Sequence, residues 1–381
     1  MDQGKGAPSF YNTVKGYVDA GWNTYLINTN TLDEIADQRL EGIHHISIPA
    51  YPQNRHDNKV SKWLYNNNAQ NYYNKCFRKE LNELCSSVDL DGCLLYAYEI
   101  GAVPVAKEYS QKYGIKLITR FQGTILGVKK VNLLNRFAYN HHFEALSTPA
   151  DMIIMTDDGS FGDRIIGELG NKSPLRFWRN GIRMPTERDF HFDDESFRDG
   201  GKKLMTVSRL ANWKRVDRAI SAMPDVLAKF PDTKLYIVGE GEEKEHLVEL
   251  AENLEVSNNV IFVGGIPQEQ VYGYINQCDI FLSFYDYSNV GNPLYEAMIC
   301  GKTIITLNNG DTSSVIKNDE NGILIDAGDA NRCAKYIIDI LADGEKAKRL
   351  GDAARRYAEK NFWSWDDRIA EELRVVEELL D

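Results

Sequence analysis

Two basic residues stand close together after an apolar run in the second half of the chain. Ser208 and Arg209 follow the run Leu204–Val207, and Lys214 lies where the next helical pattern begins. Open α/β sheets bind ligands beyond the carboxyl ends of their strands. Cations at such a turn, with helix N–H groups nearby, could therefore hold a diphosphate. Solvated surface charge is the alternative interpretation of this pair.

A second strand–turn–helix pattern lies further along the chain. The segment Gly291–Met298 follows the apolar run Ile280–Ser283. Gly291 permits close backbone approach, and Pro293 suits the first turn of a helix. Glu296 comes one turn later, and its carboxylate could accept two hydrogen bonds from a vicinal diol such as ribose. The alternative role for Glu296 is to complement the helix dipole.

A third turn contains Gly239-Glu240-Gly241 between the run Lys234–Val238 and a helical pattern. Gly-x-Gly alone is a weak signature, because a tight turn with no ligand has the same requirement for glycine.

The elements expected to position these motifs alternate along both halves of the chain. Short β-branched or apolar runs alternate with longer amphipathic stretches, as in α/β domains with parallel sheets. A chain of 381 residues is too long for one core and fits two such domains. Strands are expected at residues 24–28, 44–48, 93–97, 116–120, 152–156, 204–207, 234–238, 260–263, 280–283, 303–306 and 322–325, and helices at 9–20, 216–230, 242–255, 268–277 and 364–380.

The predicted domain organisation has four parts. Residues 1–185 form a first Rossmann-like domain, 186–201 a linker, 202–360 a second Rossmann-like domain, and 361–381 a helix that crosses back to the first domain. The glycine loop of Gly4 and Gly6 precedes every strand candidate, whereas such a domain normally opens with a buried strand. The first strand of domain one is therefore expected to be absent from the chain. We expect the natural reading frame to supply it upstream.

Charge and cysteine content narrow the class of protein. The net charge is −12, which combines +2 over residues 1–185 with −14 over the remainder. Nucleic acid is an improbable partner for such a chain, and the first half would face an anionic acceptor or membrane surface. Drift in surface composition is the alternative. The six cysteines form no C-x-x-C pair, and no secretory leader opens the chain, so we expect a cytoplasmic protein with no metal site.

In combination these motifs resemble the family 4 glycosyltransferases, which are retaining enzymes of the GT-B fold. The resemblance rests on Arg209, Lys214, the turn at Gly239–Gly241 and the segment Gly291–Met298, in this order and spacing. It is close over the second half and looser over the first. It implies two Rossmann-like domains facing across a cleft.

The resemblance also implies roles for individual residues. Arg209 and Lys214 would neutralise the donor diphosphate, and Glu296 would hold the ribose hydroxyls, so these three form the predicted catalytic set. The implied donor-binding residues are Ser208, Gly239, Glu240, Gly241, Ile266, Ser288, Gly291, Asn292, Pro293 and Leu294. The acceptor or sugar side would comprise Gly4, Gly6, Gln122 and Gly123.

Two positions depart from the family pattern, and both would face the sugar. Ser288 stands where the family has the first glutamate of its Glu-x7-Glu motif, with Asp286 nearby. Gln122 stands near a position where the family often has a histidine. Glutamine can donate and accept hydrogen bonds but cannot act as a base. The nucleotide class of the donor is therefore better defined than the sugar.

The resulting prediction is a metal-independent hexosyltransferase acting with retention. The donor would be a nucleotide sugar, with UDP favoured over GDP, and would serve as substrate with no cofactor. The acceptor would be a hydroxyl of a glycan, a lipid-linked molecule or a small molecule, as in polysaccharide assembly. The enzyme would be cytoplasmic, with a peripheral contact of its first domain at the inner membrane face. The alternatives are a non-catalytic nucleotide-sugar-binding subunit and a GT-B sugar-nucleotide epimerase.

Overall fold

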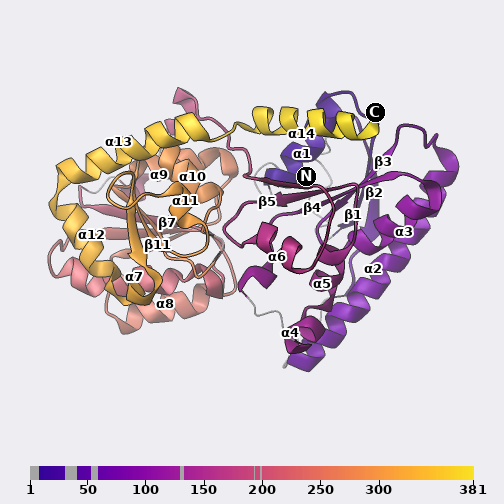
Figure 1. Cartoon of the computed structure of the whole chain (residues 1–381). Helices are drawn as coiled ribbons and strands as arrows, with labels where there is room; N and C mark the ends of the chain where they lie inside the picture. The colour runs from indigo at the N-terminus through magenta and orange to yellow at the C-terminus, as the bar shows by residue number, and fades with distance from the viewer. Residues whose placement is uncertain are drawn as a thin grey trace. The chain divides into compact units, whose positions relative to one another are not determined.

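The computed structural model describes residues 8–30, 41–52, 59–128, 133–192, 194–197, 200–287 and 289–381. They divide into two compact units, each an α/β domain with parallel strands (Figure 1). Unit 1 holds the described residues up to Arg179 together with Asp366–Asp381, and unit 2 holds Asn180–Trp365. The predicted class of two parallel-sheet α/β domains is confirmed.

Unit 2 contains one six-stranded parallel sheet in the order β12-β11-β10-β7-β8-β9. Its strands are β7 (Lys203–Val207), β8 (Lys234–Val238), β9 (Val260–Gly264), β10 (Ile280–Ser283), β11 (Thr303–Asn308) and β12 (Ile323–Asp326). The chain builds β7, β8 and β9 toward one edge and then crosses to β10 on the other side of β7. The order of strands therefore reverses between β7 and β10, which is where open α/β sheets form a ligand crevice.

Helices cover both faces of this sheet (Figure 1). Because side chains alternate along a strand, Leu204 faces one core and Met205 the other. The Leu204 side packs against α7 (Val216–Leu227), α8 (Lys244–Asn253) and α12 (Cys333–Ala342), and the Met205 side against α9 (Val271–Gln277), α10 (Asn292–Ile299) and α13 (Gly344–Asn361). The remaining elements of unit 2 are α11 (Thr312–Val315), η2 (Glu187–Phe190), η3 (Glu195–Phe197), η4 (Asn212–Lys214), η5 (Gln268–Gln270) and η6 (Ala327–Arg332).

Unit 1 has its described strands in two separate parallel sheets. One is β1 (Thr24–Asn30) with β2 (Ile43–Pro49). The other is β3 (Leu94–Tyr98), β4 (Lys116–Phe121), β5 (Met152–Thr156) and β6 (Leu175–Trp178) in that order. Over the described ranges no ladder joins β1 to β3, and the two strands belong to different sheets. The helices of unit 1 are α1 (Pro8–Asp19), α2 (Lys59–Ser87), α3 (Val103–Tyr113), η1 (Ile125–Val128), α4 (Leu133–Ala138), α5 (Asn140–Ser147), α6 (Gly162–Glu168) and α14 (Trp365–Leu380).

The stretch expected to be a linker, 186–201, lies within unit 2 instead. It packs through aromatic side chains: the Phe197 ring stacks on Tyr236 with centroids 3.7 Å apart, and Phe192 meets Tyr274 edge-on at 4.8 Å. The unit boundary accordingly falls after Arg179, earlier than residue 185. At the other end Phe362 is still part of the unit 2 core, and the chain enters unit 1 only at Asp366.

Helix α14 is fastened to the sheet of unit 1 by a buried charge cluster. Arg120 of β4 and Arg368 of α14 each donate to Glu372 Oε2 over 2.9 Å, and the Tyr96 hydroxyl donates to Glu372 Oε1 over 2.7 Å. The side chains of Arg120 and Glu372 are fully buried. The cluster thus joins β4 to a residue 252 positions later in the chain.

Candidate functional site

The switch point of unit 2 brings the loop after β7 and the loop after β10 together. The two strands pair in parallel, so both loops leave the same edge of the sheet. The Asp286 N–H donates to Trp213 O over 2.9 Å, and the Lys214 ammonium lies 4.1 Å from the centre of the Tyr285 ring. The first predicted motif therefore contacts the loop that leads from β10 toward the second motif.

The glycine turn after β8 joins the same edge. The Ser208 N–H donates to Val238 O over 3.0 Å, and the Leu210 N–H donates to Glu240 O over 2.9 Å. A Cβ atom on Gly239 would lie 1.9 Å from Ser208 O, and one on Gly241 would lie 2.3 Å from Leu210 O. Gly239 also has a φ of +138°. Both glycines are thus required by the close approach of two backbone loops, which a Gly-x-Gly pattern alone could not establish.

Arg209 is the more exposed of the two predicted phosphate ligands. Its side chain is 67% exposed and pairs with Glu242 at 3.1 Å. Exposed pairs of this kind contribute at most about 1 kcal/mol, so an anionic ligand could replace Glu242 as the partner of Arg209. The edge of the sheet thus carries one exposed guanidinium and one ammonium beside loops of backbone N–H groups, which is suited to a diphosphate.

Helix α10 begins where the second motif predicted. Gly291 is its N-cap residue, and Pro293 lies in the first turn. The N–H of Leu294, an implied donor-binding residue, donates to Gly291 O over 3.0 Å. This donor is therefore engaged within the helix turn in the structure. Asn292, the first residue of α10, precedes Pro293, which has no N–H.

Glu296 is buried rather than exposed to solvent. Its side chain is 5% exposed and accepts a hydrogen bond from Gln268 Nε2 over 2.6 Å. Burial raises the pKa of this carboxyl to about 7, against an ordinary value of 4.5. Ile266, an implied donor-binding residue, is half-buried against the core on the Met205 side of the sheet. Gln268 was not among the predicted site residues, because only its position two residues after Ile266 distinguishes it in the sequence.

At the carboxyl edge of the unit 1 sheet, Gln122 and Gly123 lie close to two carboxylates. Gln122 follows β4, where its N–H donates to Glu99 Oε1 over 2.8 Å and its Nε2 donates to the Tyr98 hydroxyl over 2.6 Å. Gly123 has a φ of +127°, and a Cβ there would lie 2.4 Å from Asp158 Oδ2. Burial raises the pKa of Glu99 to about 7. Glu99 and Asp158 were missed, although each closely follows a strand.

Three predicted site residues, Gly4, Gly6 and Ser288, lie outside the described residues. Asp286, the residue nearest to Ser288 that could supply a carboxylate, is described. Its carboxylate pairs with Arg218 at 2.7 Å and with Arg215 at 3.3 Å. Asp286 thus serves to hold the loop after β10 against the start of α7, which argues against its replacing the glutamate of the family pattern.

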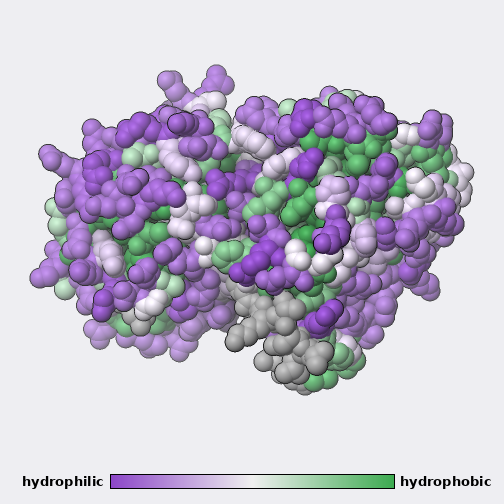
Figure 2. Space-filling model, in the orientation of Figure 1, coloured by the Kyte–Doolittle hydropathy of each residue, from purple (hydrophilic) through white to green (hydrophobic). Residues whose placement is uncertain are grey.

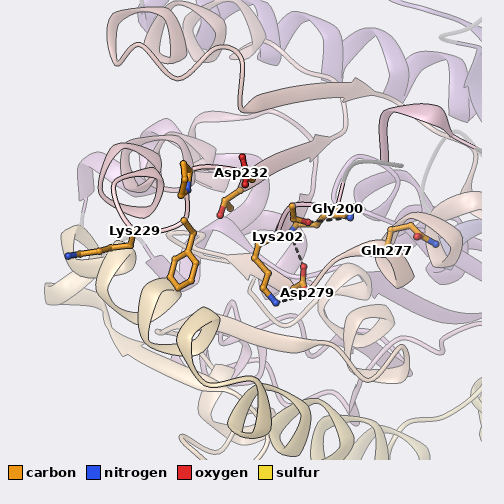
Figure 3. Close-up of a pocket in the computed structure, with 11 residues that line it drawn as sticks. Gly200, Lys202, Lys229, Asp232, Gln277 and Asp279 are labelled. Atoms are coloured by element: carbon orange, nitrogen blue, oxygen red, sulfur yellow. Dashed lines mark hydrogen bonds and ion pairs between the residues drawn. The ribbon is translucent and has the colours of Figure 1, made fainter.

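A depression at the opposite edge of the unit 2 sheet carries no predicted residue (Figure 3). It is lined by residues at the amino-terminal ends of β7, β8 and β10, including Lys202, Asp232 and Asp279. Lys202 Nζ lies 3.7 Å from Asp279 Oδ1, and Lys229 extends away from this pair in Figure 3. Lys202 is paired with Asp279, and the carboxyl ends of the strands, where open α/β sheets bind ligands, lie at the other edge of the sheet.

Two kinds of feature are absent from the described ranges. No helix there is both long and apolar enough to cross a membrane. Within the same ranges, no three His, Cys, Asp or Glu side chains are grouped so that they could hold a metal ion.

Comparison with known proteins shows that part of the chain is similar in sequence to glycosyltransferases. Residues 187–357 match the family described as "Glycosyl transferases group 1". Over 254 residues the chain is 30% identical to the N-acetyl-alpha-D-glucosaminyl L-malate synthase of Bacillus anthracis, covering 66% of this chain and 65% of that protein. Over 174 residues it is 30% identical to the GDP-mannose-dependent alpha-(1-6)-phosphatidylinositol monomannoside mannosyltransferase of Mycolicibacterium smegmatis, covering 44% and 45%.

The similarity of fold extends over the full chain. The sucrose-phosphate synthase of Thermosynechococcus elongatus superposes with a TM-score of 0.78 at 18% identity, covering 100% of this chain and 96% of that one. The fold is therefore that of the GT-B glycosyltransferases, and residues 187–357 carry their group 1 sequence pattern. The chain spans between about half and two thirds of the length of the two curated relatives.

Proposed function

We propose that the chain is a retaining, family 4 type hexosyltransferase that uses a nucleoside diphosphate sugar as donor. The observation that carries the proposal is the assembly at the switch point of unit 2. There Arg209, Lys214, the glycine turn and the start of α10 share one edge of a parallel sheet. The match of residues 187–357 to the group 1 glycosyltransferases supports the same assignment.

In the proposed reaction the nucleoside diphosphate leaves the anomeric carbon of the sugar. Arg209 and Lys214 stabilise the charge that develops on the β-phosphate, an effect larger in the transition state than in the bound donor. The acceptor hydroxyl attacks the same carbon from the face of departure, and the leaving phosphate oxygen takes its proton. This front-face course follows the family resemblance. Glu296 accepts hydrogen bonds from the ribose hydroxyls.

The donor nucleotide and the acceptor are also part of the proposal. The sequence favours UDP, while the name of one curated relative specifies GDP-mannose, so both nucleotides belong in the test. The acceptor is a hydroxyl of a glycan, a lipid-linked molecule or a small molecule. We further propose that the reaction needs no metal ion or cofactor, and that unit 1 makes a peripheral contact with a membrane surface.

A thermal-shift screen with UDP, GDP and their sugar conjugates tests the proposal. A ligand at 100 times its dissociation constant stabilises the folded protein by about 2.7 kcal/mol, which is a readily measured rise in melting temperature. The shift should occur for one nucleoside diphosphate, persist in EDTA, and shrink for the bare nucleoside. If neither nucleotide raises the melting temperature, the assigned site is wrong.

A non-catalytic binding subunit is the second candidate. It is favoured by Gln122, which stands near the position of the family's histidine and is held by Tyr98 and Glu99. Hydrolysis of the donor distinguishes the two. Slow release of nucleotide from its sugar conjugate supports the enzyme, and binding without any turnover, with or without candidate acceptors, supports the subunit.

A further inference from the structure

The first half of α2 has a composition that its helical conformation does not explain. Residues 65–74 consist of three tyrosines, five asparagines, one glutamine and one alanine, with no charged residue, although 26% of the chain is charged. Asparagine and tyrosine are only moderate helix formers, and glutamate, lysine and arginine are better ones. The composition therefore indicates that these side chains have a role of their own.

Three tyrosine rings meet on one flank of α2. The centroid of the Tyr51 ring, which follows β2, lies 5.4 Å from that of Tyr65 and 5.4 Å from that of Tyr72. Asn68 is three positions after Tyr65 and four before Tyr72, so the three share this flank of the helix. The rings are half-buried and Asn68 is exposed, so aromatic surface and an amide reach solvent together. We name this surface the tyrosine face, and its members are Tyr51, Tyr65, Asn68 and Tyr72.

The tyrosine face lies near the carboxyl ends of the unit 1 strands. The Tyr51 N–H donates to the Tyr73 hydroxyl over 2.9 Å, which places this part of α2 beside the carboxyl end of β2. Gln70 Nε2 donates over 2.8 Å to the carbonyl oxygen of Gly101, in the loop after β3. Gln122, an implied acceptor-side residue, is bonded to the same loop through its backbone N–H. The face and Gln122 therefore lie on the same side of unit 1.

The chemistry of the face matches a neutral sugar chain. The apolar C–H face of a pyranose ring can stack on an aromatic ring, and a side-chain amide can donate to one hydroxyl and accept from the next. Phosphate groups and nucleic acids need cations, and residues 65–74 contain none. The surface over the middle of α2 that faces the viewer in Figure 2, located from Figure 1, is mostly hydrophilic. On that side α2 thus offers no broad apolar patch of the kind that forms the core of a protein interface.

We propose that the tyrosine face is a subsite for a neutral oligosaccharide, where it binds sugar units of the acceptor that lie away from the reacting hydroxyl. A glycan chain has consecutive pyranose rings, so it can engage more than one tyrosine at once, which a single small acceptor does not do. The role of this ligand as acceptor rests on the proposed function, whereas its binding to the face does not.

Isothermal titration of the full chain with hexasaccharides tests the proposal. The neutral probes are hexasaccharides of glucose, mannose and N-acetylglucosamine, compared with their monosaccharides and with an anionic hexasaccharide of galacturonic acid. At least one neutral hexasaccharide should bind at least about tenfold more tightly than its monosaccharide, because several rings are engaged together. Tyr72→Ala and Asn68→Ala should each weaken that binding by roughly three- to tenfold, and Tyr72→Phe, which keeps the ring, should bind as the wild type does.

Asn71→Ala and Tyr113→Ala are the matched controls and should bind the hexasaccharide normally. Asn71 is exposed on α2 but directly precedes Tyr72, so it points away from the flank of the tyrosine face. Tyr113 is half-buried at the last residue of α3, close in the chain to the amino end of β4. For every variant the rise in melting temperature with nucleotide should match the wild type, which identifies a fold defect separately.

The proposal is overturned if the wild type binds none of the neutral hexasaccharides or binds only the anionic one. Undiminished binding by Tyr72→Ala, or equal weakening by Asn71→Ala, also overturns it. A wild-type protein that responds to nucleotide but to no neutral hexasaccharide would retain the proposed function without this subsite. One that binds a hexasaccharide through the tyrosine face but responds to no nucleotide would retain the subsite and refute the assigned donor site.

Discussion

An arginine lies at the carboxyl edge of the sheet in each unit, but one is exposed and the other is buried. In unit 2, Arg209 after β7 is 67% exposed beside glycine-rich backbone loops. In unit 1, Arg120 near the end of β4 is fully buried and bonded to Glu372 of α14. The first arginine can be used by a ligand, whereas the second holds two distant parts of the chain together. Substitutions at the unit 2 edge should therefore change ligand binding, and substitutions at the unit 1 edge should change the unfolding free energy.

The largest effect is expected in unit 1, from Glu372→Gln. This change removes the anion between Arg120 and Arg368 and leaves two guanidinium groups buried without it. Removing one partner of a buried charge cluster costs about 3–5 kcal/mol of unfolding free energy. Urea denaturation followed by circular dichroism measures the loss.

Glu371→Gln is the matched control for Glu372→Gln, one residue earlier in α14. Glu371 pairs with Arg374 at 2.7 Å on the surface, where the pair is about half exposed. Its loss should cost less than about 1 kcal/mol. If the two variants lose equal amounts of unfolding free energy, the burial of Glu372 does not make its ion pairs more important than the exposed pair of Glu371.

The next largest effect is expected in unit 2 and concerns binding. Arg209→Ala and Lys214→Ala should each weaken binding of the nucleoside diphosphate by roughly 1.5–3 kcal/mol, since each removes a charge-assisted contact. Isothermal titration should show little change for the bare nucleoside. The unfolding free energy should change by no more than about 0.5 kcal/mol, as for exposed residues generally. Lys229→Ala at the opposite edge should leave binding unaltered, and an equal loss for nucleoside and diphosphate would refute a phosphate role.

A smaller effect on stability is expected from Gly239→Ala. The new Cβ would lie 1.9 Å from Ser208 O, and the residue would have to keep a φ of +138° or move the loop. Backbone strain of this kind costs on the order of 1–3 kcal/mol, and the displaced loop should also weaken nucleotide binding. Gly344→Ala, where a Cβ meets nothing within 4 Å, is the control and should not destabilise the protein. A neutral Gly239→Ala would mean that the two loops are not in the close contact described.

The last prediction concerns the pH dependence of unfolding through Glu296. Its pKa is about 7 in the folded protein against an ordinary 4.5, so the folded state holds the proton more tightly than the unfolded state. The contribution of this group to stability is then present below pH 4.5 and is lost as the pH rises through 7. Glu296→Gln keeps an acceptor for Gln268 and cannot ionise. Its melting temperature should exceed that of the wild type at pH 8, and the difference should shrink toward pH 5.

The same variant tests the proposed contact with ribose. Glu296→Gln should weaken binding of UDP or GDP more than binding of their 2′-deoxy analogues, because the charged acceptor for the diol is lost. Equal weakening for both sugars would leave Glu296 with a role in the helix dipole alone. A difference in melting temperature that is the same at pH 5 and pH 8 would exclude the raised pKa.

Most of the sheet structure was accessible from the sequence, because buried parallel strands are continuous β-branched or apolar runs. The strand expected at 234–238 is β8, and that expected at 280–283 is β10. β6 was missed: it is only four residues long, and Arg176 interrupts its apolar character. In the site, the glycine turns and the start of α10 were predictable, since backbone geometry restricts the residue types that fit there.

The remaining features depend on contacts that no local pattern reveals. In the sequence, Glu372 is one of several acidic residues on an amphipathic helix. Only the folded chain shows that Arg120 is its partner. Likewise, the aromatic residues Phe192 and Phe197 have no periodicity, so the stretch that contains them resembled a linker until Tyr236 and Tyr274 were seen to pack against it. The burial of Glu296 beside Gln268 is of the same kind.

The attachment of α14 to β4 also has a consequence for synthesis of the protein. All of unit 2, Asn180–Trp365, emerges from the ribosome before Glu372 does, although unit 1 begins first. Domains generally fold as units and in order of their synthesis. Here the order is inverted: unit 2 can fold before Glu372 has been synthesised, while Arg120 stays without its counter-ion until α14 has been translated. Unit 1 thus begins before unit 2 and is completed after it, and a chain truncated before Glu372 would contain a folded second unit and an unfinished first one.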